Sequence, residues 1–199
     1  MIFTAHRINT IDELMSIPTE FGVEIDIRNY GDKLILSHDP YDIGEDFEDF
    51  IKEYNHSFII LNVKCERIEH KILEMISKYK IKDYFLLDCS FPMIYKLSNE
   101  EEKNIAIRYS EFESVQNSII MKNRVKWVWI DSFENLTLNS EKYKILKDCN
   151  FNICVVSPEL QNKNTKIEEY ANIMLSENII PDMICTKIYN VDRWKKMFI

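Results

Sequence analysis

The chain has 199 residues, with 33 acidic and 25 basic side chains and a formal net charge of −8. This charge argues against nucleic acid or an anionic membrane as the main partner, and no apolar run approaches the roughly 18–20 residues that span a bilayer. Because the chain contains only three glycines, the sequence excludes the glycine-rich phosphate loops of nucleotide-binding folds.

Short β-branched or aromatic runs alternate with amphipathic segments of helical periodicity along the chain. The predicted strands cover residues 2–5, 22–27, 57–64, 84–89, 104–109, 126–131, 152–156 and 183–186. A Tyr30-Gly31-Asp32 sequence is typical of a turn and predicts a small hairpin after the second strand, with its return arm at 33–37. Thr10 with Glu13 three residues later predicts a capped helix between the first two strands.

This repetition of strand and helix with short connections predicts parallel strands joined by right-handed crossovers. Eight units could close into a (β/α)8 barrel or lie in an open doubly wound sheet. We predict an α/β protein with a compact (β/α)8 TIM barrel, forming one domain over residues 1–199. Dividing 199 residues by eight gives about 25 residues per unit, which is close to the lower limit for this barrel.

Five cysteines occur without any C-x-x-C pair, which favours buried, reduced thiols over a zinc site. The first predicted strand begins at Ile2, so we expect no secretory signal. Both observations favour a cytoplasmic location. The sequence makes no prediction of the oligomeric state.

The second predicted strand carries two carboxylates. Because side chains two residues apart share one face of a strand, Glu24 and Asp26 point together, and Val23, Ile25 and Ile27 occupy the other face. Two carboxylates inside a barrel repel each other, and a hard divalent cation that prefers oxygen ligands would relieve this repulsion. An ordinary exposed strand with alternating polarity is the alternative.

Imidazole and cationic side chains follow the neighbouring strand ends. His6 and Arg7 come directly after the first strand, and His38 follows the hairpin. The third strand presents Asn62 and Lys64 on one face. Barrel active sites lie at these strand ends, and such a set suits a phosphoryl group, whose oxygens bind cations while imidazoles transfer protons. For Lys64, an outward-facing side chain with its ammonium in water is the alternative.

Ala5-His6-Arg7, then Glu24-Ile25-Asp26, then His38-Asp39-Pro40 at the end of the hairpin resemble the glycerophosphodiester phosphodiesterase family. The family pattern is H-R, then E-x-D, then H-D, on a TIM barrel shared with phosphatidylinositol-specific phospholipase C. Weaker matches follow in order at Asn62-Val63-Lys64, at residues 87–91 and at residues 182–187. The resemblance covers residues 2–190, and the first 40 residues carry most of its specificity.

The resemblance implies roles for seven residues. The implied roles are catalysis for His6 and His38, phosphate binding for Arg7 and Lys64, and binding of Mg²⁺ or Ca²⁺ for Glu24, Asp26 and Asn62. A substrate hydroxyl or water would attack phosphorus while one imidazole accepts its proton and the other protonates the leaving alkoxide. The cation would neutralise the non-bridging oxygens. We expect His6 to be the base and His38 the acid.

The sequence departs from the family pattern in two places. The H-R-G sequence with its following E-N-T loop is shortened here to His6-Arg7-Ile8-Asn9-Thr10. The third metal ligand, a glutamate in the family, is Asn62, whose amide oxygen can coordinate a cation but brings one negative charge fewer. Glu66, two residues beyond Lys64, is the other candidate for this third ligand.

The expected function is therefore metal-dependent hydrolysis of a glycerophosphodiester or a related alcohol phosphodiester. Two alternatives stay open: a phospholipase-type lyase that releases a cyclic phosphate, and a catalytically impaired barrel that binds a phosphorylated ligand. The expected partner is a small-molecule phosphodiester, with no nucleic acid and no transmembrane segment.

Overall fold

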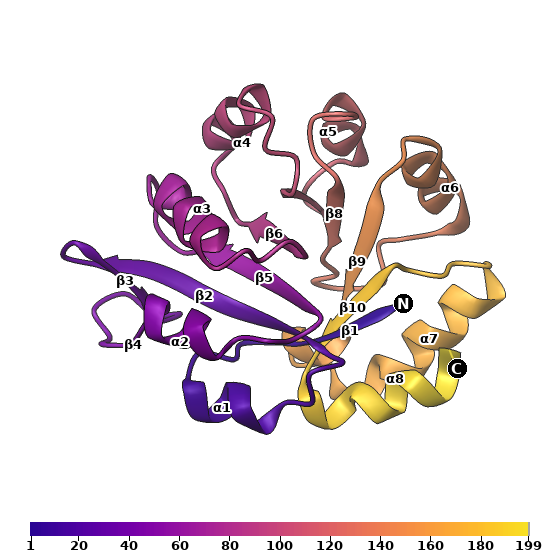
Figure 1. Ribbon diagram of the computed structural model, residues 1–199. Helices are drawn as coiled ribbons and strands as arrows, with labels where there is room; N and C mark the ends of the chain where they lie inside the picture. Colours follow the sequence, from indigo (N-terminus) through magenta and orange to yellow (C-terminus); the bar gives the residue numbers. More distant parts are fainter. Residues whose placement is uncertain (199) are drawn as a thin grey trace.

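The computed structural model describes residues 1–198. Within these residues, eight parallel strands form the barrel, and the helices lie around its outside (Figure 1). The barrel strands are β1 (Ile2–Ala5), β2 (Gly22–Tyr30), β5 (Phe58–Val63), β6 (Tyr84–Leu87), β7 (Ala106–Tyr109), β8 (Trp127–Ile130), β9 (Asn152–Val156) and β10 (Met183–Thr186). The predicted TIM barrel is confirmed, and the alternative of an open doubly wound sheet is wrong.

The ring of strands is complete, but one seam is weak. Parallel ladders join the strands from β7 through β8, β9, β10, β1, β2 and β5 to β6. Between β6 and β7, a single parallel bridge pairs Leu86 with Ile105, and the Leu86 backbone N–H donates to the Asn104 carbonyl at 2.9 Å. This single bridge joins the two ends of the ladder.

The connections between strands are short. The helices are α1 (Ile11–Ser16), α2 (Phe47–Glu53), α3 (Glu69–Lys78), α4 (Phe91–Asn99), α5 (Val115–Ile120), α6 (Ser140–Asp148), α7 (Ile167–Ser176) and α8 (Val191–Phe198). The predicted capping box at α1 is confirmed, because Thr10 Oγ1 accepts from the Glu13 N–H and the Glu13 carboxylate accepts from the Thr10 N–H. Among the described residues, no helix combines the length and apolarity that a bilayer crossing requires.

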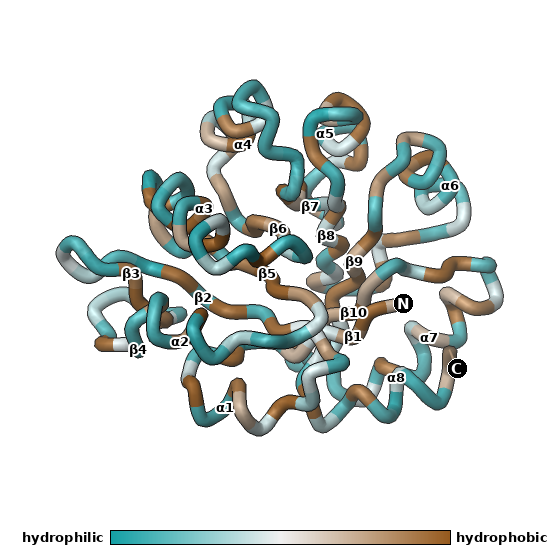
Figure 2. Tube along the Cα trace, in the orientation of Figure 1, coloured by the Kyte–Doolittle hydropathy of each residue, from teal (hydrophilic) through white to brown (hydrophobic). Residues whose placement is uncertain are grey.

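The strands separate two apolar layers. On β2, Val23, Ile25 and Ile27 face outward and pack in the large core between strands and helices. A second cluster fills the barrel interior, where the Trp127 ring on β8 lies 5.3 Å from that of Phe58 on β5 and 5.0 Å from that of Phe85 on β6. Figure 2 shows apolar residues concentrated along the barrel strands. This apolar cluster fills the lower part of the barrel interior, so polar side chains can occupy the interior at the C-terminal strand ends.

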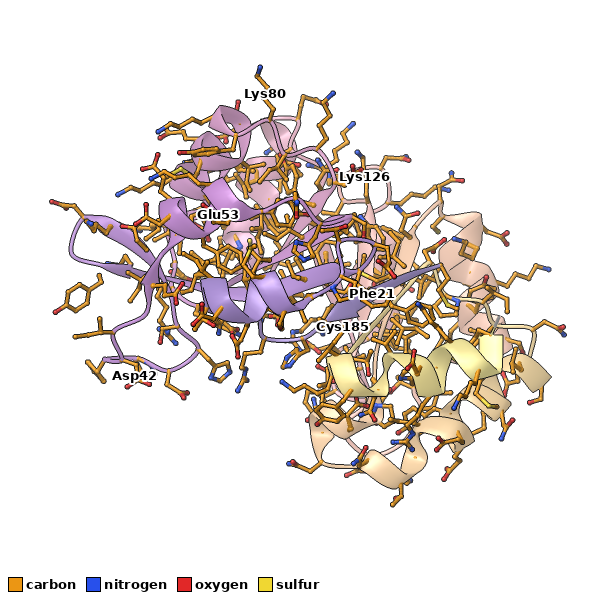
Figure 3. All side chains as sticks on the ribbon, turned by 60° about the horizontal axis from the view of Figure 1, so that its bottom comes forward. Phe21, Asp42, Glu53, Lys80, Lys126 and Cys185 are labelled. Atoms are coloured by element: carbon orange, nitrogen blue, oxygen red, sulfur yellow. The ribbon has the colours of Figure 1, made fainter. Side chains whose placement is uncertain are left out.

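The hairpin after β2 brings further polar residues to these strand ends. β2 continues beyond the barrel and pairs antiparallel with β3 (Lys33–Leu36), which in turn pairs with β4 (Glu45–Asp46). Gly31 has φ of +57° in the connecting turn, a conformation that glycine adopts without steric cost. The predicted hairpin is confirmed. The segment that follows β3 starts with Ser37 and His38, and its loop reaches the outer edge of the molecule at Asp42 (Figure 3).

Candidate active site

A polar cavity of about 250 Å³ lies at the C-terminal ends of the barrel strands. Its lining consists of His6, Arg7, Asp26, His38, Asn62, Lys64, Arg108, Trp129, Asp131, Val156, Leu160 and Gln161. Six of the seven residues that the sequence predicts for the site are in this lining. The seventh, Glu24, is fully buried and contacts three of them, His6, Arg7 and Asn62. The structure thus brings the seven side chains together.

Glu24 is held by hydrogen bonds from two directions. The Arg7 backbone N–H donates to Oε2 at 2.7 Å, and Asn62 Nδ2 donates to Oε1 at 2.8 Å. Arg7 has φ of +58°, an uncommon conformation for a residue with a side chain. Burial, and then repulsion from the Asp26 carboxylate, raise the pKa of Glu24 to about 7 despite these hydrogen bonds. A nearby cation would be needed to keep this carboxyl fully ionised.

Asp26 is also buried, but it has several partners. It exchanges two hydrogen bonds with Asn9: Asn9 Nδ2 donates to Oδ2 at 2.9 Å, and the Asp26 N–H donates to Asn9 Oδ1 at 2.8 Å. Arg7 Nε lies 3.5 Å from Oδ2, and Lys64 Nζ lies 3.4 Å from Oδ1. The shortened first loop therefore still supplies a site residue, Asn9, which the sequence patterns did not single out.

The pKa of His6 is strongly lowered. Burial lowers the pKa of its imidazole to about 3, and the charges of Lys187, Arg7 and Lys64 and of a protonated His38 add to this effect. Its ring is therefore neutral near pH 7. Nε2 lies 3.6 Å from Glu24 Oε2, and Nδ1 has no hydrogen-bond partner among the described residues.

His38 is more open to solvent, with 38% of its side chain exposed. Its Nδ1 lies 2.9 Å from Asp39 Oδ1, and this hydrogen bond lowers the pKa of Asp39, which stays a carboxylate. Arg28 donates to the His38 carbonyl from Nε at 3.1 Å and from Nη2 at 2.9 Å. The backbone of His38 is thus anchored while its ring faces the cavity.

An ion-pair network also lines the cavity. Its charged residues come from β7 and from the ends of β6 and β8, for which the sequence predicted no site residue. Arg108 donates from Nε to Asp88 Oδ1 at 2.7 Å and from Nη1 to Asp131 Oδ2 at 2.8 Å. Gln161 Nε2 donates to Asp131 Oδ1 at 2.9 Å. The indole Nε1 of Trp129 is buried in the cavity lining and has no acceptor among the described residues. These groups add a guanidinium and a free N–H donor to the site.

The alternation of side chains along β7 and β8 could have indicated part of this network. Arg108 lies two residues after Ala106, and Trp129 two residues after Trp127, so each shares its neighbour's inward face. Asp131 is the first residue beyond β8 on the same face. Because the pattern does not say which face of β7 or β8 is inward, it could not place these side chains without the barrel.

The expectation that Glu66 can supply a metal ligand is wrong. It depended on continued alternation after Lys64, but β5 ends at Val63, and Glu66 lies in the following turn. Glu66 is exposed and lines a neighbouring cavity together with Asp88 and Ser90, away from Glu24 and Asp26. A third oxygen ligand would therefore have to come from Asn62.

The donor set fits a hard divalent cation. Glu24 and Asp26 supply carboxylate oxygens, and register between β2 and β5 places Asn62 directly beside Asp26. Asn62 Oδ1 is buried without a hydrogen-bond partner among the described residues. Within residues 1–198, no three His, Cys, Asp or Glu side chains are grouped to hold a metal, so the amide oxygen has to complete the set. An orphaned acceptor and a carboxyl with a raised pKa are both relieved by a cation.

The barrel and the polar cavity at its mouth define a TIM-barrel protein with its candidate site in the usual place. No protein-family model matches the sequence, and no curated protein matches it. Among solved structures, a protein assigned as a glycerophosphoryl diester phosphodiesterase from Agrobacterium tumefaciens has a TM-score of 0.71 and 9% identity, over 98% of this chain and 98% of that chain.

Two further structures have the same fold. A glycerophosphodiester phosphodiesterase from Agrobacterium tumefaciens has a TM-score of 0.63 and 11% identity, over 93% of this chain and 96% of its own. A glycerophosphoryl diester phosphodiesterase from Parabacteroides distasonis has a TM-score of 0.66 and 12% identity, over 100% of this chain and 87% of its own. The fold of this chain is therefore the fold of these phosphodiesterases.

Proposed function

We propose that the protein is a metal-dependent phosphodiesterase that hydrolyses a glycerophosphodiester or a related alcohol phosphodiester. One observation carries the proposal: a single cavity is lined by a neutral, partly buried imidazole, a second imidazole beside a carboxylate, and three cationic side chains. The fold that the chain shares with solved glycerophosphodiester phosphodiesterases supports it.

Phosphate binding falls to the cations and the free donor of the cavity. Arg7 and Lys64 each lie about as close to Asp26 as an ion pair requires, at 3.5 and 3.4 Å, so they are held at the cavity wall with N–H groups to spare. Trp129 Nε1 offers a further donor to a phosphate oxygen. Donors fixed before the substrate arrives stabilise charge that develops on the phosphoryl oxygens.

The two imidazoles divide the proton transfers. His6, neutral because burial lowers its pKa to about 3, accepts the proton of the attacking water or substrate hydroxyl. His38, at the open side of the site with Asp39 beside Nδ1, protonates the leaving alkoxide. Asp39 holds the ring and stabilises its protonated form. Glu24, Asp26 and Asn62 would hold the metal, which would neutralise the negative charge on the non-bridging phosphate oxygens.

Replacing Asn62 by glutamate tests the metal site. The change adds a third carboxylate beside Glu24 and Asp26, so we expect lower thermal stability without divalent cations at pH 8 and roughly tenfold tighter cation binding. The measurement is Tm during titration with MgCl2, CaCl2 or MnCl2, since a ligand of the folded state raises Tm with concentration. Asn55→Glu, at an exposed position, is the control and should leave both quantities unchanged. A cation response equal in Asn62→Glu and wild type would remove Asn62 from the metal site.

A second function has specific support. Asp26 is already neutralised by Arg7 and Lys64 and hydrogen-bonded to Asn9, and Asn62 lacks a charge. Both facts favour a barrel that binds a phosphorylated ligand without turnover. Incubation of the protein with a panel of glycerophosphodiesters and Mg²⁺, Ca²⁺ or Mn²⁺, with EDTA as control, distinguishes the two. Metal-dependent release of the alcohol supports the enzyme, whereas saturable binding of the diesters with no release under any metal supports the binding barrel.

A further inference from the structure

The peptide unit that joins His6 to Arg7 connects two of the proposed functional groups. The imidazole belongs to the residue on one side of this peptide, and the guanidinium belongs to the residue on the other. Arg7 has φ of +58°, in the left-handed region that residues with a side chain seldom adopt. Such a conformation persists only where contacts from the surrounding structure hold it. The contacts that hold this peptide therefore fix both groups.

Both polar groups of this peptide contact charged side chains, and the two charges have opposite signs. The Arg7 N–H donates to Glu24 Oε2 at 2.7 Å, and the His6 carbonyl oxygen accepts from Lys187 Nζ at 3.2 Å. Among the described residues, Lys187 is the only donor to this carbonyl. An anion at the N–H and a cation at the carbonyl match the direction of the peptide dipole.

Reversal of the peptide, by rotation about the line between its two Cα atoms, would exchange these contacts. Because a peptide is planar, its reversal changes only ψ of His6 and φ of Arg7, and it moves φ of Arg7 to the favoured negative range. The reversed carbonyl would point toward Glu24 and the reversed N–H toward the Lys187 ammonium, and both pairs are unfavourable. Without the Lys187 ammonium, one of these two penalties and one favourable hydrogen bond are lost.

The backbone on either side of this peptide is anchored by other backbone groups. The His6 N–H donates to the Thr186 carbonyl at 2.9 Å, and the Ile8 N–H donates to the Glu24 carbonyl at 2.8 Å. Reversal of the peptide between them leaves both hydrogen bonds in place. The orientation of the intervening peptide therefore depends on side chains and not on strand pairing.

Lys187 directly follows β10, and its backbone is held by Glu159, which lies between β9 and α7. Glu159 Oε1 accepts from the Lys187 N–H at 3.0 Å and from Thr186 Oγ1 at 2.5 Å. The other carboxylate oxygen accepts from the Ser157 hydroxyl, which itself accepts from the buried Trp194 indole at 2.8 Å. These hydrogen bonds place the start of the Lys187 side chain within reach of the His6 carbonyl.

We propose that Lys187 is a positioning residue whose ammonium, together with Glu24, holds the peptide between His6 and Arg7 in a single orientation. This orientation fixes the imidazole that accepts the proton relative to the guanidinium that binds phosphate. Lys187 is not among the described residues that line the cavity, so it acts through this peptide and not on the substrate. Its effect on catalysis rests on the proposed phosphodiesterase function, whereas the orientation of the peptide is a property of the folded chain.

Amide hydrogen exchange measured by NMR tests this role without any substrate. Lys187→Met keeps an apolar side chain of similar length and removes the donors. We expect the Arg7 amide to exchange roughly 10- to 100-fold faster in this variant, the range of a hydrogen bond to a charged group. The His6 and Ile8 amides, which donate to backbone carbonyls, should exchange as in wild type. Lys187→Arg, which keeps a charged donor, should leave all three rates unchanged.

The neighbouring amides distinguish positioning from general stability. An equal increase at His6, Arg7 and Ile8 in Lys187→Met would mean that the lysine only supports the local fold, and this result would overturn the proposal. An unchanged Arg7 amide would overturn it as well. Lys196→Met, at an exposed position of α8, controls for the loss of one positive charge and should leave the three rates as in wild type.

Catalysis provides the second measurement. At pH 8, Lys187→Met should lower kcat/KM for the glycerol n-propyl phosphodiester by about tenfold, and Lys187→Arg should retain most of the activity. Burial and then the Lys187 charge lower the pKa of His6, but at pH 8 this imidazole is neutral with or without that charge. Full activity of Lys187→Met would refute the positioning role. If wild type hydrolyses no diester, the phosphodiesterase proposal fails, and exchange of the Arg7 amide alone decides whether Lys187 holds the peptide.

Discussion

His38→Ala should lower kcat/KM for an n-propyl phosphodiester by about 10²–10⁴-fold, the usual contribution of a general acid. Hydrolysis of the corresponding p-nitrophenyl diester should stay within about tenfold of wild type, because nitrophenolate leaves without protonation. The expectation follows from the place of His38, which is half-exposed at the mouth with Asp39 beside Nδ1. Initial rates on both esters, taken at the same pH and metal concentration, give the comparison.

His6→Ala should instead lower the rates on both esters by a similar factor, since a good leaving group does not replace the base. Burial keeps His6 neutral, with a pKa of about 3, and Glu24 lies next to its ring. His70→Ala is the control, because His70 pairs with Glu100 on the outside of the barrel. Rescue of His6→Ala but not His38→Ala by the nitrophenyl ester would reverse the two roles. Full activity of both variants would exclude the pair from catalysis.

Glu24→Gln should abolish metal-dependent activity and at the same time raise Tm at pH 8. Wild-type Glu24 has a folded pKa of about 7, above the usual 4.3 of a free glutamate. The folded state therefore binds more protons than the unfolded state between these values, and wild-type stability falls as pH rises from about 4 to 7. The variant has no such dependence at this position.

Relative to wild type, Glu24→Gln should gain several degrees in Tm at pH 8 without divalent cations and show little difference at pH 4. The new amide can still accept from the Arg7 N–H, and once the Asn62 side-chain amide turns over, its NH2 group can donate to Asn62 Oδ1, which is orphaned in wild type. Saturating Mg²⁺ or Ca²⁺ should reduce this difference in Tm, because the cation should stabilise only the wild type. Glu53→Gln, exposed on α2, controls for the loss of one surface charge. A Tm loss of equal size at both pH values would contradict the buried repulsion.

Much of the barrel could be predicted because short strands buried on both faces have a distinctive composition. The predicted bounds agree with the structure for β1, β9 and β10. Alternation on β2 also assigns Glu24 and Asp26 to one face and Val23, Ile25 and Ile27 to the other, as observed. Because side chains on a strand alternate between its two faces, only one choice remains, namely which set faces the helices. Burial of the three aliphatic residues beneath the helices decides it.

The remainder of the site depends on three-dimensional closure. Asn9 reaches Asp26 from a loop with no periodic pattern, and Arg108 meets Asp88 only because β6 and β7 become neighbours in the ring. The Glu66 prediction failed since alternation holds only while the backbone is extended, and β5 ends three residues earlier.

The weak seam between β6 and β7 couples the candidate site to the barrel itself. One bridge joins the two strands, whereas β2 and β5 pair over six residues. The ion pair between Arg108 and Asp88 spans this seam at the mouth of the barrel and holds the ends of β6 and β7 together. Sparse backbone pairing favours local opening, so amide hydrogens along β6 and β7 should exchange with solvent before those of β2 and β5. An anion that binds Arg108 competes with Asp88 for its guanidinium group. Occupancy of the cavity should therefore change how often the barrel opens locally between β6 and β7.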